Sequence, residues 1–148
     1  MSISSRFAVA VHTLTLIEAG RGEPVTSERI AESANTNPAV IRRILCMLSR
    51  AGMTCSRLGT GGGALLARPA SEITLLDVFR AVEDGELFSM HHEEPSARCP
   101  VGRNIQAVLE ETTTDAQQSL EAVLADRTVA DVLEQVAAHA AGEAVERR

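Results

Sequence analysis

Residues 26–67, TSERIAESANTNPAVIRRILCMLSRAGMTCSRLGTGGGALLA, decide the fold of this 148-residue chain. The stretch predicts a short helix that begins at Thr26 or Ser27, then a tight turn, then a second helix over Pro38–Ala51. Asn37 is a strong N-cap candidate for the second helix, and the proline that follows it loses no hydrogen bond at the first helical position. The stretch therefore begins with two helices joined by a tight turn.

The second part of the stretch predicts a β-hairpin. Two short extended runs, Met53–Leu58 and Ala64–Ala67, are separated by the glycine-rich segment Gly59–Gly63. A nucleotide-binding loop is excluded, because no Gly-Lys-Ser/Thr sequence follows and the glycines lead into a strand and not into a helix. For the glycine segment alone, a hairpin turn without any ligand remains an alternative.

Helical periodicity continues on both sides of this stretch. Apolar residues recur at helical spacing over Ser5–Ala19, and Thr74 with Asp77 is expected to form a capping box at the start of another helix. Residues 84–99 show no period and are expected to be a linker or effector loop. Residues 1–83 are therefore expected to form one winged helix-turn-helix domain.

The C-terminal part of the chain predicts two more helices. Apolar residues at a mean spacing near 3.6 predict a single helix over Pro100–Asp126, of about 26 residues and roughly 40 Å. Thr128 and Asp131 are expected to cap a final helix. Residues 100–141 are expected to be dimerisation helices, and residues 142–148 a frayed tail. The predicted fold class is mainly α with a small β-hairpin wing: a winged helix-turn-helix plus a long dimerisation helix.

Composition and charge narrow the classes of partner. The AVILMFWYC set makes up 45% of the residues and charged residues 23%, a balance typical of a globular protein and not of a disordered or membrane-spanning one. Residues 1–69 carry eight Arg and four Glu, whereas residues 70–148 carry six Arg and sixteen acids. This asymmetry fits an anionic partner that contacts one end of the molecule, although charge alone is equally compatible with surface solvation.

The second helix of the opening stretch divides its residues between two faces. Its apolar residues fall within about 60° of Ile41 around the helix axis and form a core stripe: Ile41, Ile44, Leu45 and Leu48. Small residues and arginines occupy the opposite side and its flank: Ala39, Arg42, Arg43, Cys46, Ser49 and Arg50. A helix exposed only for solubility would usually mix charges in intrahelical Glu–Arg pairs. This face is therefore expected to contact a negatively charged partner.

Two helices, the second with a cationic face, followed by a hairpin are the layout of a winged helix-turn-helix. In that layout the second helix fits the major groove, where arginine reads guanine edges, and the wing reaches the backbone or the minor groove. The amides of the glycine segment are expected to donate hydrogen bonds to phosphates, since no Cβ stands in the way. The expected partner is double-stranded DNA.

The long C-terminal helix needs a surface that covers its apolar stripe. A second copy of the chain would supply one and would place two DNA-binding domains on a palindromic site. A helix within an intramolecular bundle is the alternative. The residues expected at the dimer interface are Ile105, Val108, Leu109, Thr112, Ala116, Leu120 and Val123.

A series of motifs runs through essentially residues 1–135. In chain order they are Ile30-Ala31-Glu32, Leu48-Ser49-Arg50-Ala51-Gly52, Gly59-x-Gly61-Gly62-Gly63, Leu66-Ala67-Arg68-Pro69, Glu72-Ile73-Thr74-Leu75-Leu76-Asp77-Val78, Ala81-Val82-Glu83, Cys99-Pro100 and Thr128-x-Ala130-Asp131-Val132. Together they resemble the Rrf-two family of bacterial winged-helix regulators, the family of IscR, NsrR and CymR. The resemblance implies a homodimeric transcription regulator, usually a repressor, with the long helix as the dimer element.

The resemblance also implies particular DNA contacts. It places base contacts on Asn37, Ala39, Val40 and Arg42. The family's wing arginine stands directly before the glycine segment, where this chain has Leu58, and Arg57 is one place earlier. The full set of residues expected at the DNA is Ser27, Asn37, Ala39, Val40, Arg42, Arg43, Arg50, Arg57, Thr60, Gly61 and Gly62.

The cysteines depart from the family pattern. Cluster-binding relatives resemble one another in having three cysteines in the loop between the fourth and fifth helices, whereas residues 84–99 contain only Cys99. One thiolate per chain cannot hold an all-cysteine iron–sulfur cluster. A mixed cluster of His12 and Cys99 across a dimer is an alternative, but Ala8 and Ala34 supply no further ligands. We expect no cofactor, and His12 is expected in the core.

Cys99 is a candidate sensor residue. It would lie at the N-cap of the long helix, where the helix dipole and free N–H groups lower the pKa of a thiol. With His91 and His92 it could instead bind a transition metal. An inert capping cysteine and solvated histidines are the alternatives, and the effector stays open.

Other function classes have less support in the sequence. No arrangement of nucleophile, base or cofactor motif appears at usable spacing, so an enzyme is not expected. Three cysteines far apart, no apolar run of membrane-spanning length and no signal-peptide layout predict a reduced cytoplasmic protein without a membrane partner. A protein-interaction module that no longer binds DNA remains an alternative.

Overall fold

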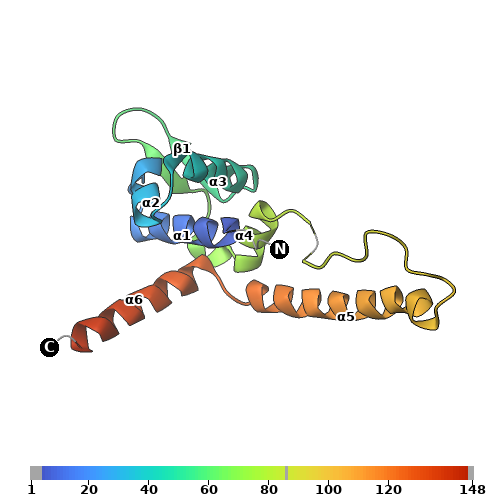
Figure 1. Cartoon of the computed structure of the whole chain (residues 1–148). Helices are drawn as coiled ribbons and strands as arrows, with labels where there is room; N and C mark the ends of the chain where they lie inside the picture. Colours follow the sequence, from blue (N-terminus) through green and yellow to red (C-terminus); the bar gives the residue numbers. More distant parts are fainter. Residues whose placement is uncertain (1–4, 86, 147–148) are drawn as a thin grey trace. The chain divides into compact units, whose positions relative to one another are not determined.

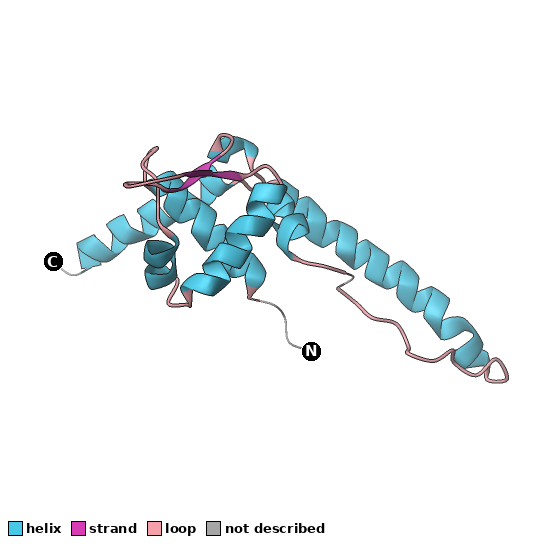
Figure 2. Cartoon of the chain, turned by 90° about the horizontal axis from the view of Figure 1, so that it is seen from above, coloured by secondary structure: helices cyan, strands magenta, loops and turns pink. Residues whose placement is uncertain are grey.

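The computed structural model describes residues 5–85 and 87–146 of the chain. Its elements, in chain order, are α1 (Arg6–Ala19), α2 (Ser27–Ser33), α3 (Pro38–Arg50), β1 (Thr54–Arg57), β2 (Gly63–Leu66), the 3-10 helix η1 (Ala70–Glu72), α4 (Leu75–Val82), α5 (Pro100–Ala125) and α6 (Val129–Glu146) (Figure 1). Helices dominate these residues and the two strands form a small antiparallel hairpin (Figure 2). The predicted mainly α fold with a hairpin wing is confirmed. No helix within the described ranges is both long and apolar enough to cross a membrane.

The described residues form two compact units. One contains residues 5–83 together with 125–146, and the other contains residues 84–124. The first unit includes the predicted winged helix-turn-helix, and the second consists of a loop and nearly all of α5.

The core of the first unit positions α3. Its residues form two buried clusters, and α1 contributes to both of them. The first cluster joins α1, α3, α4 and α6 and includes Leu14, Ile44, Leu48, Val78 and Val129. The second joins α1, α2, α3 and the hairpin and includes Ile17, Ile30, Ile41 and Ala64. Burial of this apolar surface holds α3 from one side only, which leaves its other face in solvent.

The start of α6 belongs to the first unit. Val129 is fully buried in the core, and its N–H donates a hydrogen bond to the carbonyl of Ile73 at 2.9 Å. The N–H of Leu75 donates to the carbonyl of Arg127 at 2.8 Å. The expected grouping of residues 100–141 as dimerisation helices therefore differs from the packing, because α6 begins on the winged helix-turn-helix domain.

Both ends of α6 can be compared with the sequence prediction. At its N-terminus the predicted cap is confirmed: a carboxylate oxygen of Asp131 accepts the N–H of Thr128 at 2.8 Å, and the Thr128 hydroxyl accepts the N–H of Asp131 at 3.2 Å. The helix then continues to Glu146, so the prediction of a frayed tail beyond Gly142 is wrong for residues 142–146. Residues 147 and 148 lie outside the described ranges. Five alanines from residue 137 to residue 144 favour continued helix.

The second unit presents a helix without a core of its own. α5 has no buried residue along its 26 residues, and it ends one residue before the predicted Asp126. Val108 and Val123 of the apolar stripe leave 56% and 59% of their surface in solvent. Ile105 and Leu120 are half-buried and the other residues of the predicted stripe are exposed, so the stripe is present and largely uncovered within one chain.

The hairpin is attached to the domain at its base. β1 pairs with β2 from Thr54 opposite Leu66 to Arg57 opposite Gly63. On the other edge of β2, Ala64 exchanges two backbone hydrogen bonds with Val25, at 3.0 and 2.8 Å. The segment before α2 therefore acts as a third extended segment that fixes the root of the wing.

Candidate nucleic-acid interface

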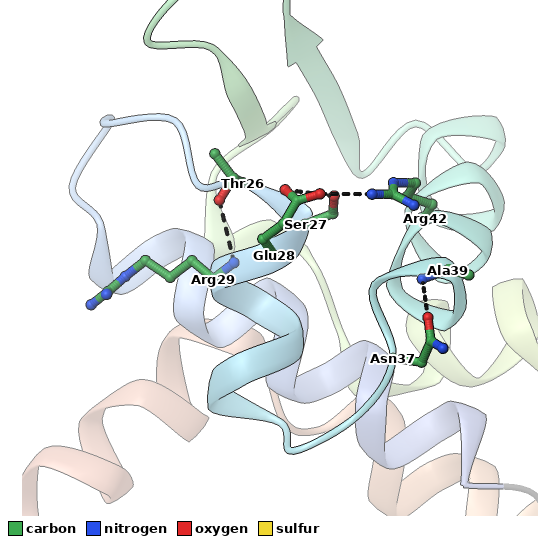
Figure 3. Close-up of polar contacts among 7 residues, drawn as sticks. All are labelled: Thr26, Ser27, Glu28, Arg29, Asn37, Ala39 and Arg42. Carbon is green, nitrogen blue, oxygen red and sulfur yellow. Dashed lines mark hydrogen bonds and ion pairs between the residues drawn. The ribbon is translucent and has the colours of Figure 1, made fainter.

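Local capping fixes the two helices of the helix-turn-helix. The Thr26 hydroxyl accepts the N–H of Arg29 at 3.3 Å at the start of α2. The Asn37 side-chain oxygen accepts the N–H of Ala39 at 2.8 Å at the start of α3 (Figure 3). Both caps were expected from the sequence and are confirmed. Asn37 therefore caps α3 through its side-chain oxygen, and this cap does not involve its amide nitrogen.

The two faces of α3 lie as the periodicity predicts. Ile41, Ile44 and Leu48 are buried and Leu45 is half-buried. All six residues predicted for the other face and flank are exposed: Ala39, Arg42, Arg43, Cys46, Ser49 and Arg50. Val40, a base contact in the family resemblance, is half-buried and packs against the core. The surface that α3 offers to a partner is therefore composed of arginines and small side chains.

A groove of about 450 Å³ lies between α3 and the hairpin. Ser27 of α2, Arg42 and Arg50 of α3, and Arg57 of β1 all contribute to its walls. Among the described residues that line it there are three arginines and no acid. The structure therefore brings together four residues that the sequence placed at the DNA, on three different elements.

The tip of the wing corrects one expectation about the glycines. Thr60 and Gly61 are exposed at the tip, but the N–H of Gly62 donates to the carbonyl of Gly59 at 3.1 Å and is not available for a phosphate. A Cβ at Gly62 would lie 2.1 Å from the Arg57 carbonyl oxygen. Glycine is required there by the close approach of the chain to itself. A contact of this segment with phosphates stays a prediction.

The most informative contact at this surface is an ion pair between helices. Arg42 Nη2 lies 2.6 Å from Glu28 Oε1, and about 60% of each side chain is exposed. The hydroxyl of Ser27 donates to the second carboxylate oxygen, Glu28 Oε2, at 3.2 Å. A hydrogen bond from its own backbone N–H, and then one from Arg42, lowers the pKa of Glu28.

Sequence reasoning missed Glu28 as a residue of this surface. The faces of α3 were derived from α3 alone, and the acid belongs to the first turn of α2. Spacing along one helix carries no information about a side chain that reaches across from another helix. The only available signal was the acid beside Ser27, a residue already expected near DNA.

The candidate sensor residues lie in the second unit. Cys99, His91 and His92 are exposed. Hydrogen bonds from the backbone N–H groups of Gly102 and then Val101 lower the pKa of the Cys99 thiol. The expectation that His12 is a core residue is wrong: its ring is exposed and lies 2.8 Å from the hydroxyl of Ser33.

A family model covers almost the whole chain. It is described as Rrf2, iron-dependent transcriptional regulator, and it matches residues 3–135. That range includes the winged helix-turn-helix, the second unit and the start of α6.

Within one chain, the described residues supply no ligand set for the iron named in that description. The three cysteines are exposed and unpaired, and only Cys99 lies in the loop before α5. Within the part of the chain that the structure describes, no three His, Cys, Asp or Glu side chains come together as metal ligands. An all-cysteine cluster lacks its donor set in one chain. That the chain works without a cofactor stays a prediction.

Relatives agree with the family model. YwnA of Bacillus subtilis strain 168, a candidate HTH-type transcriptional regulator, is 44% identical over 131 residues, which are 88% of this chain and 96% of that protein. A crystal structure of a candidate DNA-binding protein is 41% identical with a TM-score of 0.70 and covers 87% of this chain and 99% of its own. T. potens IscR, at 24% identity, shares the fold with a TM-score of 0.68 over 92% of this chain and 88% of its own. The chain therefore belongs to the Rrf2 family of transcriptional regulators, and it is not an enzyme.

Proposed function

We propose that this protein is a sequence-specific DNA-binding repressor that acts in the cytoplasm as a homodimer on a palindromic site. The observation that carries the proposal is the exposed face of α3, on which Arg42, Arg43 and Arg50 lie opposite the core stripe of the helix. Arginine pairs with guanine edges in the major groove, and an α-helix fits that groove. Arg57 extends the same positive surface onto the wing.

The homodimer is supported by α5. A helix of 26 residues is about 39 Å long, and a largely exposed apolar stripe of that length is unfavourable in water. A second α5 from an identical chain would cover it in a symmetric contact. Two α3 helices would then face half-sites about one helical turn apart.

An electrophoretic mobility shift with the DNA upstream of the protein's own gene tests DNA binding. We expect a salt-sensitive complex that weakens strongly in Arg42→Ala/Arg43→Ala, because each lost phosphate or base contact reduces affinity. Arg98→Ala/Arg103→Ala is the matched control, since it also removes two positive charges, from exposed residues at the start of α5 and just before it. No complex at low salt would contradict the proposal and favour a protein-interaction module. Transcription from the bound promoter in vitro should fall when the protein is added, and a rise would identify an activator.

A second candidate function, a response to thiol modification through Cys99, is favoured by one observation. The thiol is exposed and accepts hydrogen bonds from two N–H groups at the start of α5, which stabilise the thiolate. Because Cys99 directly precedes α5, a modification there would act at the end of the proposed dimer helix.

A further inference from the structure

We propose that Glu28 is a specificity-determining residue: it holds Arg42 in position for a base edge and prevents that arginine from binding phosphates of any sequence. The inference rests on the proposed DNA-binding function and concerns the selectivity of the same surface. It follows from the 2.6 Å ion pair between α2 and α3.

The ion pair of Glu28 with Arg42 lies at an exposed position, where it contributes little to the stability of the fold. Both side chains are about 60% exposed, and ion pairs in water contribute little to folding. Exposure instead leaves the pair accessible to a nucleic acid. Arg42 also lines the groove between α3 and the wing, so it lies on the proposed DNA surface.

The carboxylate itself is held in place. One oxygen accepts from Arg42 and the other from the hydroxyl of Ser27, the preceding residue (Figure 3). Glu28 also lies in the first turn of α2, where a negative charge is favoured by the helix dipole. A fixed, charged acceptor at this point gives the Arg42 guanidinium a defined orientation.

The remaining donors of Arg42 suit a base. A guanidinium has five N–H donors, and the ion pair occupies one terminal nitrogen, Nη2. The others are free to form the paired hydrogen bonds that arginine makes with guanine O6 and N7. An arginine already held in place loses less side-chain entropy when it forms those bonds.

The same carboxylate opposes contacts that carry no sequence information. A phosphate that approached Arg42 would meet the negative charge of Glu28 and would have to displace it. A guanine edge is neutral and can share the guanidinium with the carboxylate. Glu28 therefore weakens binding to arbitrary DNA more than binding to the preferred site, and the ratio of the two affinities rises.

The experiment measures that ratio in the full chain. Duplexes are first selected from a random pool with the wild-type protein, and affinities are then compared on the selected duplex and on a scrambled duplex of equal length and composition. We expect Glu28→Gln to lower the ratio about tenfold, the discrimination that one arginine–guanine pair provides. Binding to the scrambled duplex should also become more salt-dependent, by about 0.9 in the logarithmic slope for each additional phosphate that a protomer neutralises.

Two further variants separate positioning from simple charge. Glu32→Gln removes the same charge from an exposed residue of the same helix, and we expect it to leave the ratio unchanged. In an Arg42→Ala background, Glu28→Gln should no longer change the ratio, because the residue it positions is gone. Circular dichroism would verify that each variant is folded.

The outcomes distinguish this inference from the function on which it rests. If wild-type protein selects no sequence and shows no salt-dependent binding, the proposed function fails and the inference fails with it. If wild-type protein selects a site but Glu28→Gln changes the affinity for both duplexes equally, Glu28 affects DNA binding only through its charge and not the choice of sequence. The inference is then overturned while DNA recognition stands.

Discussion

Glu83 caps the N-terminus of α1 from the far end of the same domain. Its Oε1 accepts the backbone N–H of Phe7, 76 residues earlier, at 3.2 Å, and its Oε2 lies 3.3 Å from Arg6 Nη2. The side chain of Ser5, the residue directly before α1, makes no capping hydrogen bond. A tertiary contact therefore replaces the local cap and joins the two ends of the DNA-binding domain.

We expect Glu83→Ala to lower the free energy of unfolding by about 1–2 kcal/mol, because it leaves a first-turn N–H without its acceptor. Urea denaturation of the two proteins measures the difference. Glu23→Ala removes an exposed acid from the turn before α2 and should leave the midpoint unchanged. Equal effects of the two substitutions would show that the cap contributes nothing beyond its charge.

Two valines on α6 provide a matched test of how that helix is attached. Val129 is fully buried, whereas Val136 on the same helix leaves 54% of its surface in solvent. Val129→Ala should destabilise the domain by about 2 kcal/mol, through lost apolar burial and a residual cavity. Val136→Ala should have little effect on thermal unfolding of the same chain. A similar small loss for both would mean that α6 does not belong to the domain core.

The apolar stripe of α5 predicts the oligomeric state. Replacing Val108 and Val123 by Glu places two charges in the proposed dimer interface, and we expect a monomer in sedimentation equilibrium. Thr114→Glu adds a charge roughly opposite the stripe and should leave a dimer. The monomeric variant should also bind the selected duplex much more weakly, since it contacts one half-site at a time. A monomeric wild-type chain would refute the predicted interface.

The reactivity of Cys99 follows from the direction of its pKa shift. Because N–H groups at the start of α5 lower the pKa of the thiol, more of it is thiolate at neutral pH than for an ordinary cysteine. We expect iodoacetamide to modify Cys99 faster than Cys46 or Cys55 at neutral pH, and the advantage to shrink as the pH rises. Peptide mass spectrometry at timed intervals resolves the three rates. A Cys99 no faster than Cys46 at neutral pH would remove the basis for a thiol sensor.

Local patterns were sufficient for much of the fold. The buried and exposed faces of α3 could be assigned from spacing alone, since each follows from the 3.6-residue period. The caps at Thr26, Asn37 and Thr74 could be predicted because each involves residues two or three positions apart. The end of α6 was missed, because Gly142 is a weak breaker within an alanine-rich helix.

Contacts between distant segments were not available to the same reasoning. The ion pair of Glu28 with Arg42, the cap that Glu83 provides and the pairing of Val25 with Ala64 each join residues on different elements. Their existence depends on how helices and strands pack, and a single sequence gives no measure of that. These contacts are the ones that orient an arginine, close the domain and anchor the wing.

The anchoring of the wing by Val25 has a mechanical consequence. The root of the hairpin is closely packed against the segment before α2. A Cβ at Gly63 would lie 2.7 Å from the backbone of Val25, so these two segments have little room to move past each other. The tip around Thr60 and Gly61 is exposed and has glycines at positive φ on either side of the threonine. The tip is therefore expected to bend while the root of the hairpin stays fixed. In the proposed complex, the tip would adapt to DNA grooves of different width while α3 keeps one register on the duplex.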